Sequence, residues 1–299
     1  MKLTITLKSI QYAFLLSGLT AFISCQKTSE LDIPSYISID SIGLTVTGDQ
    51  GTASNKIVDA WVYTDNDLEG AFELPAKFPV LKSGASQITI MPGIKLNGMS
   101  ETRVAYPFFN PITVPATLTH EVETKINTKF TTYKANTVFA WIENFEDPNF
   151  SLDPTSISDI SFTRIGDPAL LSLYPGEGNS FAARAFIQSD TLLFECESHD
   201  DFIFPAHSSD LESSVFLELN YKTNCPITVG LVVYGAQTVQ KPVIVINPSK
   251  VWNKIYINFT PTVLSNTTAT KYKVYLKAQK EADGPDAEIL IDNIKLLHF

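Results

Sequence analysis

The sequence predicts an all-β protein with two domains. Apolar residues alternate with polar ones in short runs, and turn-forming glycine, asparagine, aspartate and proline separate these runs. A leader that ends before Cys25 would leave 299 − 24 = 275 residues, which suits two domains of roughly 100–200 residues each. With 44% hydrophobic and 18% charged residues, the chain is too apolar to stay disordered.

The N-terminus has the pattern of a cleavable leader. Lys2 and Lys8 precede an uncharged apolar run over residues 10–23, which is shorter than the roughly 20 residues of a membrane-spanning helix. We therefore expect residues 1–24 to be a signal peptide. Ser24-Cys25 resembles the lipobox of bacterial lipoproteins, although Phe22 and Ile23 depart from its commonest pattern. The resemblance implies a lipid on Cys25; the alternative is an ordinary secretory leader.

Residues 25–36 are predicted to form a tether. The stretch from Gln26 to Glu30 resembles the export signals of Bacteroidetes-type surface lipoproteins, and the alternative is a plain polar linker. This resemblance implies an outer-membrane protein, lipid-anchored and facing either the periplasm or the cell surface. A net charge of −10 argues against a nucleic-acid partner, because such proteins normally carry a basic surface.

Residues 37–130 are predicted to form the first β domain. Short β-rich runs occur at residues 37–42, 57–63 and 87–91, with turn signals such as Gly48-Asp49 between them. Pro107, Pro111 and Pro115 favour an edge or connecting segment, since proline donates no hydrogen bond to a sheet. The stretch 59–75, followed by Gly84, resembles PEGA-type immunoglobulin-like surface modules, which implies an Ig-like sandwich.

A second β domain is predicted over residues 138–299, after a polar boundary at residues 131–138. Its expected strands lie at residues 141–146, 215–222, 229–234, 252–259, 272–278 and 289–296. In the run 272–278 apolar and polar side chains alternate, which is typical of a strand with one buried face.

These runs resemble the galactose-binding-like jelly roll of carbohydrate-binding modules. The resemblance rests on Asn144-Phe145-Glu146, the strands 217–222 and 252–257, and the closing Ile291-Asp292-Asn293-Ile294. It implies that the first and last strands lie together, often around a structural calcium ion, for which Glu146 and Asp292 are the matching carboxylates. Two carboxylates are far fewer than the six to eight oxygens that calcium takes, so an ordinary acidic pair is the alternative.

The resemblance also implies that aromatic side chains in loops bind sugar, and the candidates are Tyr174, Phe202 and Phe204. The alternative is that these rings belong to the core. Cys196 and Cys225 form an even pair that could be bridged in an oxidising compartment or remain as two buried thiols.

No catalytic motif is recognisable. The histidines lack the spacing of a zinc site, and there is no nucleophile elbow or phosphate-binding glycine loop. The sequence therefore predicts a non-catalytic surface protein that binds carbohydrate or acts in adhesion. The alternative is an accessory or structural subunit of an outer-membrane secretion, gliding or uptake machine.

Overall fold

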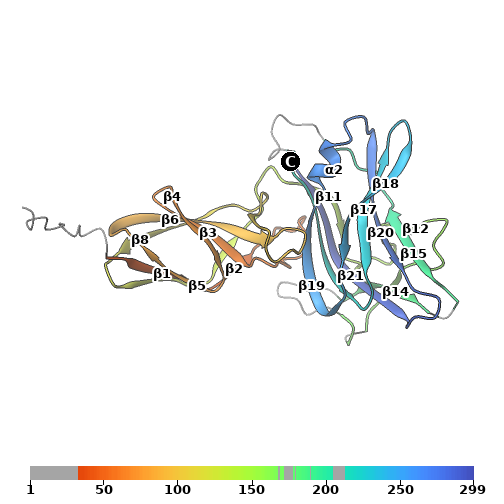
Figure 1. The fold of residues 1–299 in the computed structure, drawn as a ribbon, viewed down its shortest axis with the longest axis horizontal. Helices are drawn as coiled ribbons and strands as arrows, with labels where there is room; N and C mark the ends of the chain where they lie inside the picture. Colours follow the sequence, from red (N-terminus) through yellow and green to blue (C-terminus); the bar gives the residue numbers. More distant parts are fainter. Residues whose placement is uncertain (1–32, 168, 172–177, 179, 189, 205–212) are drawn as a thin grey trace, which may run out of the picture.

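The fold is nearly all β, as predicted (Figure 1). The computed structural model describes residues 33–167, 169–171, 178, 180–188, 190–204 and 213–299. The leader, Cys25 and most of the tether lie outside these residues. Within the described part, no helix has the length and apolarity needed to cross a membrane.

The N-terminal domain consists of short sheets around a shared core. Its strands are β1 (Ser35–Ile39), β2 (Ile42–Leu44), β3 (Asp59–Thr64), β4 (Asp67–Glu73), β5 (Ala76–Val80), β6 (Gly84–Lys95), β7 (Arg103–Ala105), β8 (Ile112–Leu118), β9 (Glu123–Ile126) and β10 (Lys129–Thr131). They pair as β5-β1-β9, as β2-β10, and as β4-β3-β6 with β7 and β8 on different stretches of β6. Residues such as Ile37, Val62 and Ile88 alternate inward and are fully buried together.

Pro115 lies in β8, opposite Gln87 of β6. Among the described strands β8 pairs only with β6, so it is an edge strand, as the prolines predicted.

The C-terminal domain is a sandwich of two sheets. Its elements are β11 (Val138–Glu143), β12 (Leu152–Pro154), β13 (Thr163–Ile165), β14 (Ala182–Ile187), β15 (Leu193–Ser198), β16 (Val215–Thr223), β17 (Ile227–Tyr234), β18 (Thr238–Ile246), β19 (Ser249–Asn258), the short helix α2 (Thr260–Leu264), β20 (Lys271–Gln279) and β21 (Ala287–His298). One sheet has six strands in the order β13-β14-β21-β16-β19, with β11 also paired to β21. The other has five strands in the order β12-β15-β20-β17-β18.

The inward faces of these two sheets form one large apolar core. The predicted strands of this domain are all present, and the first of them, β11, pairs with the last, β21.

A third apolar cluster joins the two domains. Leu44, Ile94 and Phe108 pack there against Phe216 and Leu297 of the jelly roll. Tyr106 lies at its centre and meets four aromatic rings edge-on, with centroids 4.7–5.4 Å away. The domains therefore share a continuous core, and Figure 1 shows them lying end to end.

Candidate functional site

The two outer faces of the jelly roll differ in what lies against them. The outer face of the six-stranded sheet lies against residues 45–58, which join β2 to β3. It also lies against Tyr106, at the centre of the third apolar cluster. The outer face of the five-stranded sheet carries charged and aromatic side chains that are paired within the face itself. We describe the covered face first, because it limits where a ligand can bind.

A β-bulge arranges the polar groups of the covered face. The pairing of β16 with β21 passes from Glu218–Lys295 to Asn220–Asp292, so two residues of β21 lie opposite Leu219 alone. Asn293, in this bulge, has φ +51°. Without the extra residue, residues 292 and 295 would point to opposite faces; with it, Asp292 and Lys295 both lie on the outer face.

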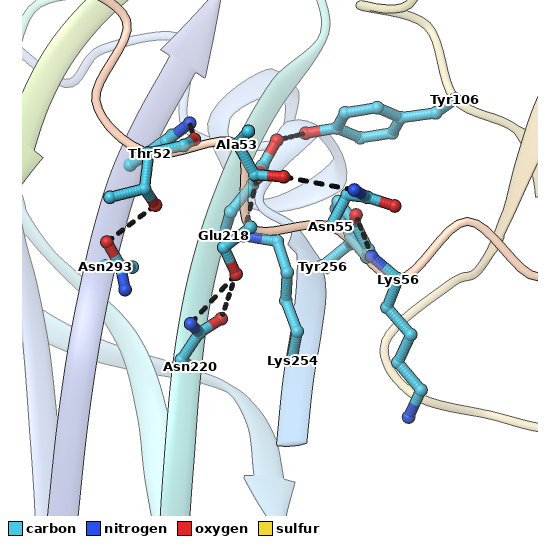
Figure 2. Close-up of polar contacts among 12 residues, drawn as sticks. Thr52, Ala53, Asn55, Lys56, Tyr106, Glu218, Asn220, Lys254, Tyr256 and Asn293 are labelled. Atoms are coloured by element: carbon cyan, nitrogen blue, oxygen red, sulfur yellow. Dashed lines mark hydrogen bonds and ion pairs between the residues drawn. The ribbon is translucent and has the colours of Figure 1, made fainter. Parts of the chain in front are cut away.

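Glu218 is the centre of the covered face (Figure 2). Its carboxylate is fully buried and accepts hydrogen bonds from the hydroxyls of Tyr106 at 2.9 Å and Tyr133 at 3.0 Å. Lys254 Nζ, also fully buried, lies 2.9 Å from Glu218 Oε2 as an ion pair, though not in a direction that makes a hydrogen bond. Burial and the charge of Glu218 together raise the pKa of both tyrosines well above its usual value.

Residues 45–58 complete this junction. Thr52 Oγ1 donates to Asn293 Oδ1 at 2.7 Å, and Ser54 hydrogen-bonds with the Asn220 amide (Figure 2). Lys295 Nζ donates to the carbonyl of Thr52 at 2.6 Å. Burial lowers the pKa of Lys295 to about 7, although the charge of Glu218 acts in the opposite direction. The part of this face around Glu218 and Lys295 is therefore sealed, and a ligand cannot reach it while the domains are docked.

The open face of the five-stranded sheet is lined by side chains that alternate with the core residues of β15, β17 and β20. Two ion pairs cross between β15 and β20, namely Glu197–Lys273 at 2.9 Å and Glu195–Lys277 at 3.0 Å. A third, Asp201–Lys271 at 2.6 Å, lies at one end of the face beside Tyr234. The ammonium of Lys271 is 4.8 Å from the centre of the Tyr234 ring.

A hydrogen bond crosses the open face, and we call the surface around it, formed by Glu195, Glu197, Lys273, Lys277 and Gln240, the trough. Gln240 of β18 donates to Glu195 Oε1 at 3.0 Å, although β17 and β20 lie between their strands. Three strand spacings measure about 14 Å in a flat sheet, slightly more than two extended side chains and one hydrogen bond can span, so the sheet is concave on this side. Tyr275 is buried in the centre of the face against Gly230, where a Cβ would come 2.7 Å from the tyrosine ring.

Phe202 and Phe204, the two predicted sugar-binding aromatics among the described residues, do not form an exposed platform. Phe202 is only 6% exposed and packs in the core near Trp141, so its assignment as an exposed sugar platform was wrong. Its backbone pairs with that of Tyr272, which pulls the loop inward. Phe204 is half-buried against Tyr272 and His298. Tyr174 lies outside the described residues.

Cys196 and Cys225 are buried free thiols. The possible bridge between them is absent from this structure. Burial raises the pKa of both thiols. These cysteines act as small core residues rather than reactive groups.

The proposed calcium ligands have other partners. Glu146 Oε1 accepts the backbone N–H groups of Ser180 and Phe181 at 2.6 and 3.0 Å, and Asp292 Oδ1 accepts the N–H of Asn293 at 2.7 Å. Among the described residues, no three His, Cys, Asp or Glu side chains gather as metal ligands. Calcium binding by Glu146 and Asp292 therefore stays a prediction.

An apolar groove of about 520 Å³ lies at the seam between the domains, beside α2. Leu96 and Val104 line it from the N-terminal domain, and Phe216, Pro261 and Leu264 line it from the jelly roll.

No family model matches the sequence, and no curated protein matches it. Solved structures that resemble part of the fold include the xylan-binding domain CBM22-1 from Paenibacillus barcinonensis, at 10% identity and TM-score 0.36, over 53% of this chain and 93% of that one. A family 11 carbohydrate-binding module of a Clostridium thermocellum cellulase has 13% identity and TM-score 0.36, over 56% and 96%. The enzymatically active domain of a bacteriophage tailspike has 11% identity and TM-score 0.33, over 52% and 20%. Likeness at this level assigns the chain neither a family nor a ligand.

Proposed function

We propose that the protein is a lipid-anchored, non-catalytic surface protein that binds carbohydrate in the trough of the five-stranded sheet. One observation carries the proposal: the trough is lined by polar side chains that already hold one another in fixed positions. Glu195 accepts from Thr155 and Gln240 and pairs with Lys277, while Glu197 pairs with Lys273.

This arrangement suits sugar chemistry. Each sugar hydroxyl both donates and accepts a hydrogen bond, so it matches a surface on which carboxylate, ammonium and amide groups alternate. Because these groups are ordered before a ligand arrives, binding loses less conformational entropy. The ring of Tyr234 adds an apolar surface for the C–H groups of a sugar ring. The other outer face offers no such surface, since it is sealed against the N-terminal domain.

The predicted anchor suits this role. In Figure 1, β1 begins at the end of the N-terminal domain that lies away from the jelly roll. A lipid on Cys25, followed by a short tether, would place the N-terminal domain as a spacer between the membrane and the trough. One acyl chain binds membranes only marginally, so we expect several acyl groups on Cys25.

Binding is tested by applying the mature protein to a glycan array and measuring the affinity of any hit by calorimetry. Gln240→Ala and Tyr234→Ala should each weaken binding at least about tenfold, as expected for central contacts. The matched controls are Gln237→Ala and Tyr63→Ala, which lie outside the trough. A protein that binds no glycan, or whose binding survives both trough variants, would contradict the proposal. Incubation with the same glycans tests the non-catalytic assignment, because released sugar would indicate hydrolysis.

The anchor is tested by metabolic labelling with an alkyne fatty acid. Wild-type protein should carry the label and Cys25→Ala should not. Label that persists in the variant would place the lipid elsewhere.

The apolar groove at the seam favours a second candidate function, that of an accessory subunit of an outer-membrane machine. An exposed apolar groove of this kind is typical of a protein–protein contact. After extraction in gentle detergent, a membrane protein should then co-purify with the wild-type protein and be lost from the Leu264→Asp variant. Glycan binding without such a partner favours the first function, and the reverse result favours the second.

A further inference from the structure

A small cavity at the seam between the domains, separate from the trough, is lined by three lysines. Lys56 and Lys95 come from the N-terminal domain, and Lys254 comes from β19 of the jelly roll. The described residues that line this cavity include no aspartate or glutamate. In a chain with a net charge of −10, such a concentration of positive charge has to be explained.

The three lysines differ in how far their charges are balanced. Lys254 is paired with the buried Glu218 at 2.9 Å. Lys95 has only a long contact, 3.7 Å, to Glu73, whose side chain is 61% exposed. Lys56 Nζ donates to the neutral amide oxygen of Asn253. Two positive charges therefore face the cavity without a close buried counter-charge among the described residues.

Asn253 holds two of the donor groups that line the cavity in place, the Lys56 ammonium and the Tyr221 hydroxyl. Its Oδ1 accepts from Lys56, and its Nδ2 donates to the hydroxyl of Tyr221 at 2.9 Å. The Tyr221 oxygen is therefore an acceptor in that bond, and its own proton is left to point at another group. The lining presents donors from two ammonium groups and one hydroxyl.

We propose that this cavity is an oxyanion-binding site, which holds one carboxylate, phosphate or sulfate group between the two domains. Its volume of about 50 Å³ exceeds the space a single water needs and suits a group of a few atoms. Lysine ammonium groups are compact point charges that bind such groups through charge-assisted hydrogen bonds. An anion there would bridge Lys56 and Lys95 across the cavity.

The pKa of Lys56 offers a way to detect a bound anion. Burial lowers the pKa of Lys56, and the charge of Lys95 lowers it further. A bound oxyanion would oppose both effects, so the pKa of Lys56 should rise on binding. Reductive ¹³C-methylation followed by NMR would measure that rise.

The test uses the mature protein and three probes, which are inorganic phosphate, sulfate and acetate. Binding of each probe is measured by calorimetry and by its effect on thermal unfolding. Sodium chloride at equal ionic strength is the control. At least one probe should bind saturably and raise the melting temperature. Because a charge-assisted hydrogen bond contributes about 1.5–3 kcal/mol, Lys95→Gln should weaken binding about tenfold or more. Phosphate or sulfate binding without acetate binding would identify a tetrahedral group as the ligand, and acetate binding would identify a carboxylate.

Asn253→Asp provides a sharper variant, because it places a carboxylate beside Lys56 and should abolish binding. The matched control is Asn247→Asp, which makes the same charge change at an exposed position. Lys95→Gln keeps the test decisive if Asn253→Asp fails to fold. The proposal is overturned if no probe binds beyond the effect of chloride, or if binding is unchanged in Lys95→Gln.

Discussion

The two outer faces of the jelly roll carry similar residues in opposite surroundings. On the six-stranded sheet, Glu218 and Lys254 are fully buried beneath the N-terminal domain. On the five-stranded sheet, Glu197 and Lys273 form the same kind of pair, but their side chains are 26% and 14% exposed. A buried charge depends on every partner it has, whereas a partly exposed one can turn to water. The first face therefore holds the two domains together, whereas Glu197 and Lys273 of the second face still reach water.

Removing a carboxylate from each face should give the largest contrast. Glu218→Ala leaves Lys254 without its counter-charge and two tyrosine hydroxyls without an acceptor, so we expect a loss of about 3–5 kcal/mol in the free energy of unfolding. Glu197→Ala should cost below about 1 kcal/mol. Urea denaturation of both variants measures the difference. Equal losses would mean that the covered face is not sealed.

The next largest effect should be on the pH dependence of stability, because Lys295 of the covered face has a lowered pKa. The folded pKa of Lys295 is about 7, against an ordinary value of 10.5, so above pH 7 the unfolded chain binds more protons. Stability should therefore rise between pH 7 and pH 9, by about 2 kcal/mol. Above pH 9 it should fall, because the raised pKa values of Cys196, Tyr106 and Tyr133 let the unfolded chain release protons first.

Lys295→Met should remove the rise between pH 7 and pH 9. Glu218, Lys254 and Tyr133 also surround this ammonium, so the variant is compared with wild type across the whole range. Lys277→Met, on the open face, is the matched control and should keep the wild-type slope. If stability still rises between pH 7 and pH 9 in Lys295→Met, another titrating group causes the rise.

A single hydroxyl on the covered face should have a smaller effect. Tyr133→Phe removes a hydrogen bond to the Glu218 carboxylate but leaves the one from Tyr106 in place. A hydrogen bond to a charged group contributes about 1.5–3 kcal/mol, and we expect a loss near the lower limit because one donor remains. Thermal unfolding of this variant measures the loss of stability, with Tyr63→Phe as the control. An unchanged stability would show that water replaces the hydroxyl.

The ion pairs of the open face should have the smallest effect. A double-mutant cycle on Glu197 and Lys273 should give a coupling energy of about 0.2–1 kcal/mol that falls as salt is added. A coupling above this range that salt does not reduce would mean that this face is also shielded from water.

The strands could be predicted from the sequence, whereas the covered face could not. Runs such as 217–222 and 272–278 show period-two alternation, which reports local burial. Lys254 and Lys295 were unremarkable in that pattern, since a lysine that alternates with apolar residues normally faces water. They are buried by the docking of the N-terminal domain, including residues 45–58 and Tyr133, which are far away in sequence. Similarly, the bond from Gln240 to Glu195 depends on the curvature of a sheet, and no short-range pattern encodes it.

The candidate ligand residues could be predicted even less well. Phe202 stands in loop-like sequence beside Asp200 and Asp201, which favours exposure, yet its backbone pairs with Tyr272 and its ring lies in the core. The trough is built from strand residues whose polar side chains look like any solvated strand face.

The strap formed by residues 45–58 also bears on the order in which the protein matures. Thr52 contacts Asn293 and Lys295, which are 241 and 243 residues further along the chain and belong to the final strand. A chain made from its N-terminus would carry Thr52 without these two partners until β21 had been added, although Asn220 and Asn253, the partners of Ser54 and Lys56, come earlier. A chain that stops before β21 would lack both partners of Thr52. The contacts of Thr52 would therefore form only after β21 has been made.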